Sequence, residues 1–149
     1  IASITSASKS QDPEGDKILC NELMSRNAET LVSLGFLDLD SFEYSKYKNI
    51  KYLFCVPKYP TNLFDPDLKK MPIRFNQVEG DYYGFSDHTL GTSAALLSFL
   101  NGASILEKHF SMGNFRQGEM EKAHLCSFTP ESLSSFKNQI TELDMLINK

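Results

Sequence analysis

YYGFSDHTLGTSAALLSFLNGASILEKHF, at residues 82–110, is the stretch that decides the fold. Residues 81–86 predict a β-strand that leads to His88, and residues 104–110 predict a second strand that contains His109. Between them, residues 92–101 predict a helix that stops at Gly102. A strand–helix–strand unit requires parallel strands, so both strands should end at the same rim of one sheet.

Side-chain parity brings four polar residues of this stretch together. Alternate residues of a strand share a face. Ser86 and His88 therefore lie on one face of the first strand, and Glu107 and His109 lie on one face of the second. Two imidazoles beside a hydroxyl and a carboxylate are suited to bind a divalent metal and an anion.

Several of these residues also have a simpler structural interpretation. Ser86 could cap the following helix, and Tyr59 could be a loop aromatic that covers the core. His124 falls in a long polar loop, where exposure to solvent competes with a role as a third ligand. Asp87 and Lys108 have the opposite parity, so they should pack away from the site or support it from behind.

The rest of the chain alternates short apolar runs with helical segments. Residues 17–21 and 50–56 predict buried strands, and residues 1–3 predict a strand end. Residues 1–16 otherwise predict a loop or a poorly ordered link. Ser25 is expected to cap a helix that carries Leu31 and Val32 on its apolar face and stops at Gly35. Thr129 is expected to cap a final helix with an apolar stripe that reaches Ile147.

This order of elements predicts an α/β protein with a parallel sheet. The 149 residues are expected to form a single domain, 1–149, without internal repeats. A closed (β/α) barrel takes about 250 residues, and this chain supplies about five strands, so the sequence predicts a partial barrel.

Composition narrows the possible partners and the compartment. A net charge of −4 argues against nucleic acid or an anionic membrane as the main partner. No apolar run is long enough to span a bilayer, and no signal peptide is visible. The three cysteines form no CxxC pair, which favours buried thiols in a reducing, cytoplasmic setting. Because the first residue is Ile1, we expect a piece of a longer chain.

The quoted stretch resembles the sialic acid synthase family, whose pattern is G-[YF]-S-D-H-T-x-G, an Ala-rich helix, and then G-A-x-x-x-E-K-H-F. FCVPKYPT at residues 54–61 is similar to its H-C-x-x-x-Y-P-T, and SFTPESL at residues 127–133 is similar to its S-L-x-P-x-x-L. Residues 1–3 are similar to the end of its K-I-A-S strand. The resemblance implies the C-terminal half of a TIM barrel.

The resemblance also implies an activity and a metal. Members of this family are N-acetylneuraminate synthases and related enzymes of sialic acid biosynthesis. They are transferases that condense phosphoenolpyruvate with an N-acetylated amino sugar. By resemblance, His88 and His109 bind the catalytic Mn²⁺ or Mg²⁺, and Glu107 lies close to the reacting carbons. The same resemblance gives Ser86 and Ser3 a contact with phosphoenolpyruvate, and Tyr59 a contact with the amino sugar.

Three departures from the family pattern leave the activity of this segment open. Pro57 stands where the family has Asn or Ser, and Ile4-Thr5 stands where it often has Gly-Glu. The family's G-P-D-H segment is expected at residues 118–121, where an acid would replace its Asp. The alternative is therefore a non-catalytic relative that keeps the scaffold for binding or assembly. In either case we expect a homodimer or pairing with the missing part of the barrel.

Overall fold

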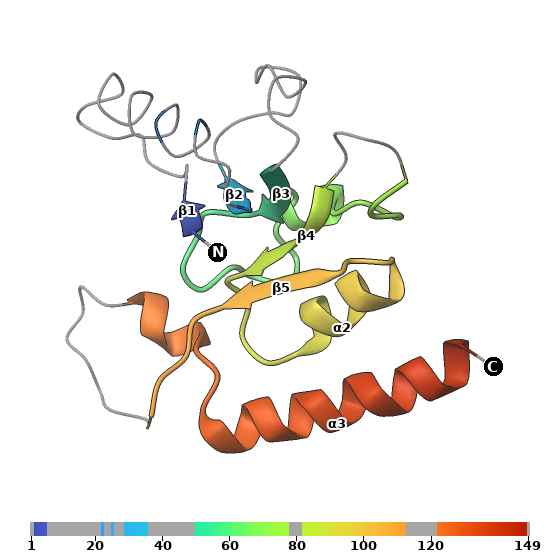
Figure 1. Cartoon of the computed structure of the whole chain (residues 1–149). Coiled ribbons are helices and arrows are strands. Elements are labelled where there is room, and N and C mark those ends of the chain that lie inside the picture. The colour runs from blue at the N-terminus through green and yellow to red at the C-terminus, as the bar shows by residue number, and fades with distance from the viewer. Residues whose placement is uncertain are drawn as a thin grey trace.

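Five parallel strands, in the same order in the sheet as in the sequence, form the centre of the computed structural model (Figure 1). They are β1 (Ala2–Thr5), β2 (Thr30–Leu34), β3 (Ile50–Cys55), β4 (Tyr82–Asp87) and β5 (Ile105–Lys108). The structure describes residues 2–5, 22, 25, 29–35, 50–77, 82–112 and 122–148. A strand order that never reverses is that of a barrel rather than of a doubly wound sheet, so the predicted partial TIM barrel is confirmed.

Helices cover one face of the sheet. α2 (Ser93–Leu100) connects β4 to β5 and ends before Gly102, whose φ of 92° is the left-handed conformation expected after a helix. α3 (Pro130–Ile147) lies beyond α2 in Figure 1. In the described residues, two short 3₁₀ helices, η3 (Leu68–Lys70) and η4 (Lys122–Cys126), lie in the loops. None of the helices in the described residues is long and apolar enough to cross a membrane.

The hydrophobic core lies on the face that α2 covers. Phe54 of β3 stacks on Phe85 of β4 with ring centroids 5.9 Å apart, and Phe75 and Ala94 belong to the same cluster. By parity, the opposite face of the strands carries Ser86 and its polar neighbours. The aromatic core thus lies on the helix-covered face, and Ser86 and Glu107 lie on the other.

The segment after Ser25 differs from its prediction. Leu31 and Val32 lie in strand β2, between β1 and β3, and not in a helix. Ser25 is itself helical and donates a hydrogen bond to the carbonyl of Glu22 at 2.7 Å, so it is not the cap that was predicted. A buried, partly β-branched run between two parallel neighbours gains a full ladder of backbone hydrogen bonds, which outweighs a weak helical period.

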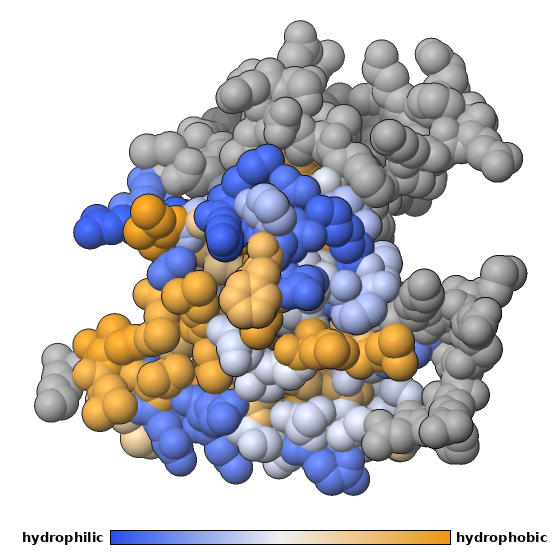
Figure 2. All heavy atoms as spheres, turned by 180° about the vertical axis from the view of Figure 1, so that it is seen from behind, coloured by the Kyte–Doolittle hydropathy of each residue, from blue (hydrophilic) through white to orange (hydrophobic). Residues whose placement is uncertain are grey.

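Two other predictions are corrected at the ends of the chain. The strand near the N-terminus extends over Ala2–Thr5, so these residues are not part of the predicted loop; residues 6–21 lie outside the described part. Thr129 caps α3 as predicted, accepting a hydrogen bond from Ser132 N. The apolar stripe of α3 packs against the core only in its first half, around Phe136. Near the end of the helix, Ile147 is 55% exposed. Apolar side chains therefore gather at the surface where α3 ends (Figure 2).

Gly84 in β4 offers a sharp test of the β4–β5 pairing. An added Cβ at this position would lie 2.1 Å from the backbone carbonyl oxygen of Ile105 in β5. We expect Gly84→Ala to force the two strands apart and to destabilise the protein by about 3 kcal/mol, seen as a drop in Tm of roughly 10 °C. Gly91→Ala is the control. Its Cβ would contact nothing within 4 Å, so only its φ of 74° should cost stability, about 1 kcal/mol. Equal losses in the two variants would contradict this pairing.

Candidate active site

A chain of hydrogen bonds crosses the polar face of the sheet from β2 to β5. Ser33 of β2 donates to Ser86 Oγ of β4 at 2.9 Å, and Ser86 donates to Glu107 Oε2 of β5 at 2.8 Å. Ser86 and Glu107 are direct partners in the strand ladder. The shared face that parity predicted for them is therefore what the structure shows.

Three rings meet just beyond these hydrogen bonds, at the carboxyl ends of the strands. The centroids of His88 and His109 lie 5.7 Å apart, with an angle of 53° between the rings. Tyr59, in the loop after β3, lies 4.0 Å from the His88 ring and 5.5 Å from the His109 ring. The structure thus brings Tyr59 and both imidazoles together, although Tyr59 is far from them in sequence.

Two further predicted residues are His124, which contacts one of these rings, and Ser3, which lies in β1. His124, in η4, is exposed and lies edge-on to His109, with 6.1 Å between the centroids. Ser3 lies in β1, with its backbone paired to Leu31, and the structure does not describe its side chain. The segment at residues 118–121, expected to replace the family's G-P-D-H, lies outside the described residues.

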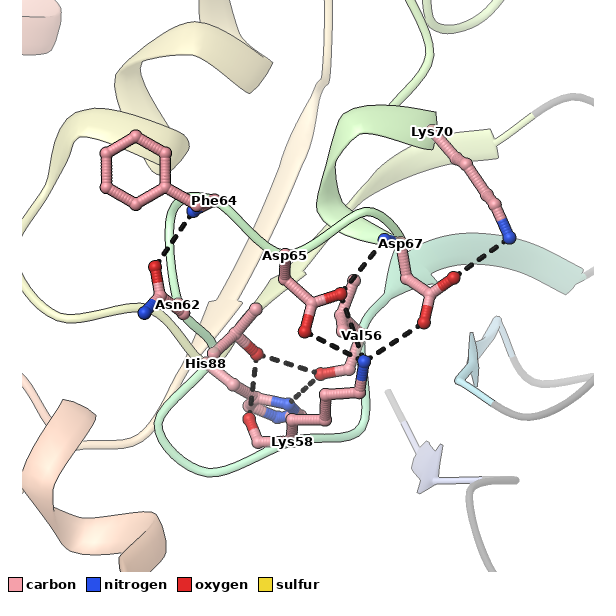
Figure 3. A network of polar contacts seen from close by, with 9 residues as sticks. Val56, Lys58, Asn62, Phe64, Asp65, Asp67, Lys70 and His88 are labelled. Carbon is pink, nitrogen blue, oxygen red and sulfur yellow. Dashed lines mark hydrogen bonds and ion pairs between the residues drawn. The ribbon is translucent and has the colours of Figure 1, made fainter.

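The backbone fixes the tautomer of His88. Its Nδ1 lies 2.9 Å from the carbonyl oxygen of Val56 (Figure 3). A carbonyl oxygen only accepts hydrogen bonds, so Nδ1 carries the proton and Nε2 keeps its lone pair. This arrangement, with one ring nitrogen donating to a backbone carbonyl, is typical of histidines that bind a metal through the other nitrogen.

The distance between the imidazoles fits a shared metal ion. An imidazole nitrogen binds a divalent metal at about 2.1 Å, which places the ring centroid roughly 3.2 Å from the ion. Two such rings with centroids 5.7 Å apart can therefore face one ion at an open angle. Within the described residues, no group of three or more His, Cys, Asp or Glu side chains is placed to hold a metal.

Burial keeps both imidazoles neutral. The pKa of His88 is lowered first by its removal from water, and the neighbouring His109 lowers it further. The pKa of His109 is lowered by burial and then by His124. A neutral imidazole is the form that binds a metal, so this environment favours ligation at neutral pH.

Burial also keeps the Tyr59 phenol and the Cys55 thiol, which lie beside the imidazoles, in their protonated forms. It raises the pKa of Tyr59 to about 12, so the phenol stays protonated and can donate a hydrogen bond. It raises the pKa of Cys55 to about 11, and the Cys55 thiol lies 3.8 Å from His88 Nδ1. Cys55 is a free, buried strand residue, as predicted, and its protonated thiol is unsuited to nucleophilic attack.

The loop after β3 is held closely around His88. The carbonyl of Val56 also accepts hydrogen bonds from Lys58 N at 2.8 Å and from Thr61 Oγ1 at 3.2 Å. Thr61 N in turn donates to the His88 carbonyl at 2.8 Å. Outside this turn, Lys58 Nζ pairs with Asp65 at 2.8 Å and with Asp67 at 3.1 Å (Figure 3). These contacts present Tyr59 to the imidazoles on a fixed turn.

The sequence did not reveal the structural roles of Pro57 and Ser33. The ring of Pro57 packs against Gly35, where an added Cβ would lie 2.9 Å from Pro57 Cβ, so Pro57 serves packing at the end of β2. Ser33 was missed because its segment was predicted to be helical. Its alternation with Val32 and Leu34, both buried, is the signal that would have placed it on the polar face.

Comparison with known proteins matches most of this chain to one family. The model of the NeuB family matches residues 11–149. N,N'-diacetyllegionaminic acid synthase of Campylobacter jejuni is 29% identical over 126 residues, which cover 78% of this chain and 36% of that protein. Pseudaminic acid synthase of Helicobacter pylori is 36% identical over 69 residues, which cover 46% of this chain and 20% of that protein.

A solved structure shows the same fold. The N-acetylneuraminic acid (sialic acid) synthetase of Leptospira borgpetersenii, solved in complex with citrate, superposes with a TM-score of 0.72 at 22% identity. The match covers 99% of this chain and 50% of that chain. This chain therefore spans half of the solved protein and about a third or less of the two curated relatives.

Proposed function

Because the chain belongs to the NeuB family, we propose that its protein is a nonulosonic acid synthase, which condenses phosphoenolpyruvate with an N-acetylated amino sugar. The observation that carries this proposal is the pair of imidazoles, His88 and His109, 5.7 Å apart at neighbouring strand ends. Relatives that share this part of the chain are named as synthases of legionaminic and pseudaminic acid, which supports the class of product.

We propose that His88 and His109 hold a divalent metal. Imidazole ligands favour Mn²⁺ over Mg²⁺, which prefers an all-oxygen shell. When bound, such an ion would supply Lewis-acid polarisation of the sugar aldehyde. His88 contributes Nε2, because its Nδ1 donates to Val56, and this bond also fixes the plane of the ring.

Ser86 and Glu107 are proposed to act beside the imidazoles. The Ser86 hydroxyl now donates to Glu107, and it would turn to donate to the phosphoenolpyruvate anion when that substrate binds. Ser33 keeps donating to Ser86 Oγ and so holds its oxygen in place. Glu107 would then be released to accept or return a proton near the reacting carbons.

Tyr59 and Ser3 complete the proposed substrate contacts. The protonated phenol of Tyr59 would donate to a polar group of the amino sugar, since its pKa is about 12. Ser3 is proposed as a second contact with phosphoenolpyruvate from β1. The remaining strands of the barrel would come from the rest of a longer chain or from a second copy, and we propose a cytoplasmic reaction.

A coupled assay tests this function. The protein is incubated with Mn²⁺, phosphoenolpyruvate and a panel of N-acetylated hexosamines, and phosphate release and product mass are measured. We expect phosphate release that depends on both the sugar and the metal, with a product mass equal to the two substrates plus water minus phosphate. Metal binding without any sugar-dependent turnover would contradict the proposal and favour the non-catalytic alternative.

A further inference from the structure

Behind the two imidazoles, on the helix-covered face of the sheet, lies a buried ion pair. Lys108 Nζ of β5 lies 2.7 Å from Asp87 Oδ2 of β4, and the two side chains are 3% and 0% exposed. Asp87 immediately precedes His88, and Lys108 immediately precedes His109. The pair therefore joins the two strands one residue before each imidazole, without lying in the site.

Both charges of the pair are satisfied by further contacts. The other carboxylate oxygen of Asp87 accepts hydrogen bonds from the backbone N and the hydroxyl of Thr89, both at 2.7 Å. Lys108 Nζ also donates to the Thr89 carbonyl at 2.7 Å and lies 5.4 Å from the centroid of the Phe128 ring. Such a closed set of contacts holds both side chains in one arrangement.

The pair stands where β4 and β5 begin to diverge. Asp87 and Lys108 are the last partners in the β4–β5 ladder. Beyond them, the His88 carbonyl accepts from Thr61 N at 2.8 Å, whereas the His109 carbonyl accepts from Phe128 N at 2.7 Å. The two imidazoles thus sit on backbone segments that bond to different neighbours. Lys108 reaches across the divergence to the carbonyl of Thr89.

Stability alone is a weak reason for such a pair. Removing two charges from water costs several kcal/mol for each ion, and a well-packed apolar pair of similar volume is often as stable. What an apolar pair does not supply is a directional link between the two strands. From this we propose that Asp87 and Lys108 are positioning residues, which set the separation and tilt of His88 and His109. Only the consequence for metal binding rests on the proposed function.

The test removes both charges and reads the ring positions directly. In Asp87→Asn/Lys108→Met the volume is nearly kept, so we expect a Tm close to that of the wild type. Nuclear Overhauser contacts between the ring protons of His88 and His109, measured without metal on protein labelled at histidine, should weaken several-fold. The affinity for Mn²⁺ should fall about 10- to 100-fold, as is typical when residues that orient the metal ligands are mutated.

A second cross-strand ion pair supplies the matched control. Lys51 of β3 pairs with Glu29, just before β2, at 2.8 Å and at a more exposed position. Glu29→Gln/Lys51→Met should leave the ring contacts and the Mn²⁺ affinity at the level of the wild type. Should the double variant of the buried pair not fold, Asp87→Asn/Lys108→Leu, which also leaves no unpaired buried charge, gives the same readout.

The outcomes separate this inference from the proposed function. Ring contacts in Asp87→Asn/Lys108→Met that match the wild type would overturn the positioning role. Weakened ring contacts in a protein whose wild type binds no Mn²⁺ would support the positioning role and contradict the metal site. Weakened contacts in both the double variant and its control would also overturn the inference, because the effect would not be specific to this pair.

Discussion

Replacing His88 by alanine is expected to abolish metal binding and to lower kcat/KM by about a thousandfold or more, because Lewis-acid polarisation supplies several kcal/mol. His88 is the better anchored of the two imidazoles, since its Nδ1 is held by the Val56 carbonyl. The variant keeps the strand ladder, so we expect it to lose bound metal and turnover while it stays folded. Metal content by plasma emission spectrometry and initial rates measure the two effects.

His124→Ala is the matched control for this substitution. It also removes one imidazole, and His124 lies edge-on to His109 with centroids 6.1 Å apart. Because no set of three ligands is formed in the described part of the chain, we expect His124→Ala to retain its metal. A His88→Ala protein that keeps full metal content would contradict the assignment of the ligands.

Glu107→Gln carries the second large expected effect. The amide keeps the shape and still accepts the hydrogen bond from Ser86, but it has no charge and does not take up a proton. We expect kcat to fall about 100-fold or more, as for loss of a general acid or base. KM for phosphoenolpyruvate should stay the same or fall, since a negative charge beside an anion is removed. Steady-state kinetics with saturating metal separates the two parameters.

Ser33→Ala serves as the control for Glu107→Gln. It removes the hydrogen bond that holds Ser86 from β2 and leaves the carboxylate in place. Its effect should be a modest rise in KM for phosphoenolpyruvate, with kcat within a few-fold of the wild type. If Glu107→Gln changed kcat no more than Ser33→Ala does, the proton-transfer role of Glu107 would be wrong.

Strand parity explains which part of the site could be predicted from the sequence. Ser86 lies two residues before His88, and Glu107 lies two residues before His109, so a period of two was enough to place each pair on one face. The same rule placed Asp87 and Lys108 on the other face. It could not show that they pair, because pairing depends on the register of β4 against β5.

Contacts made by the backbone, or by segments whose secondary structure was predicted wrongly, could not be predicted from the sequence. The Val56 carbonyl that fixes the tautomer of His88 has no side-chain signature. Ser33 was hidden because Ser25 and Gly35 look like the two ends of a helix, whereas the tertiary ladder with β1 and β3 makes the segment a strand. The position of Tyr59 over both imidazoles likewise depends on a turn that is closed by Thr61.

One measurement tests the central claim most directly, namely that two imidazoles of neighbouring strands share one cation. Pulsed electron paramagnetic resonance of the Mn²⁺-loaded protein, with histidine labelled by ¹⁵N, counts the histidine nitrogens bound to the metal. We predict two coupled ¹⁵N nuclei in the wild type and a loss of this signal in His88→Ala. Bound Mn²⁺ that shows no coupling to histidine nitrogen would contradict the account.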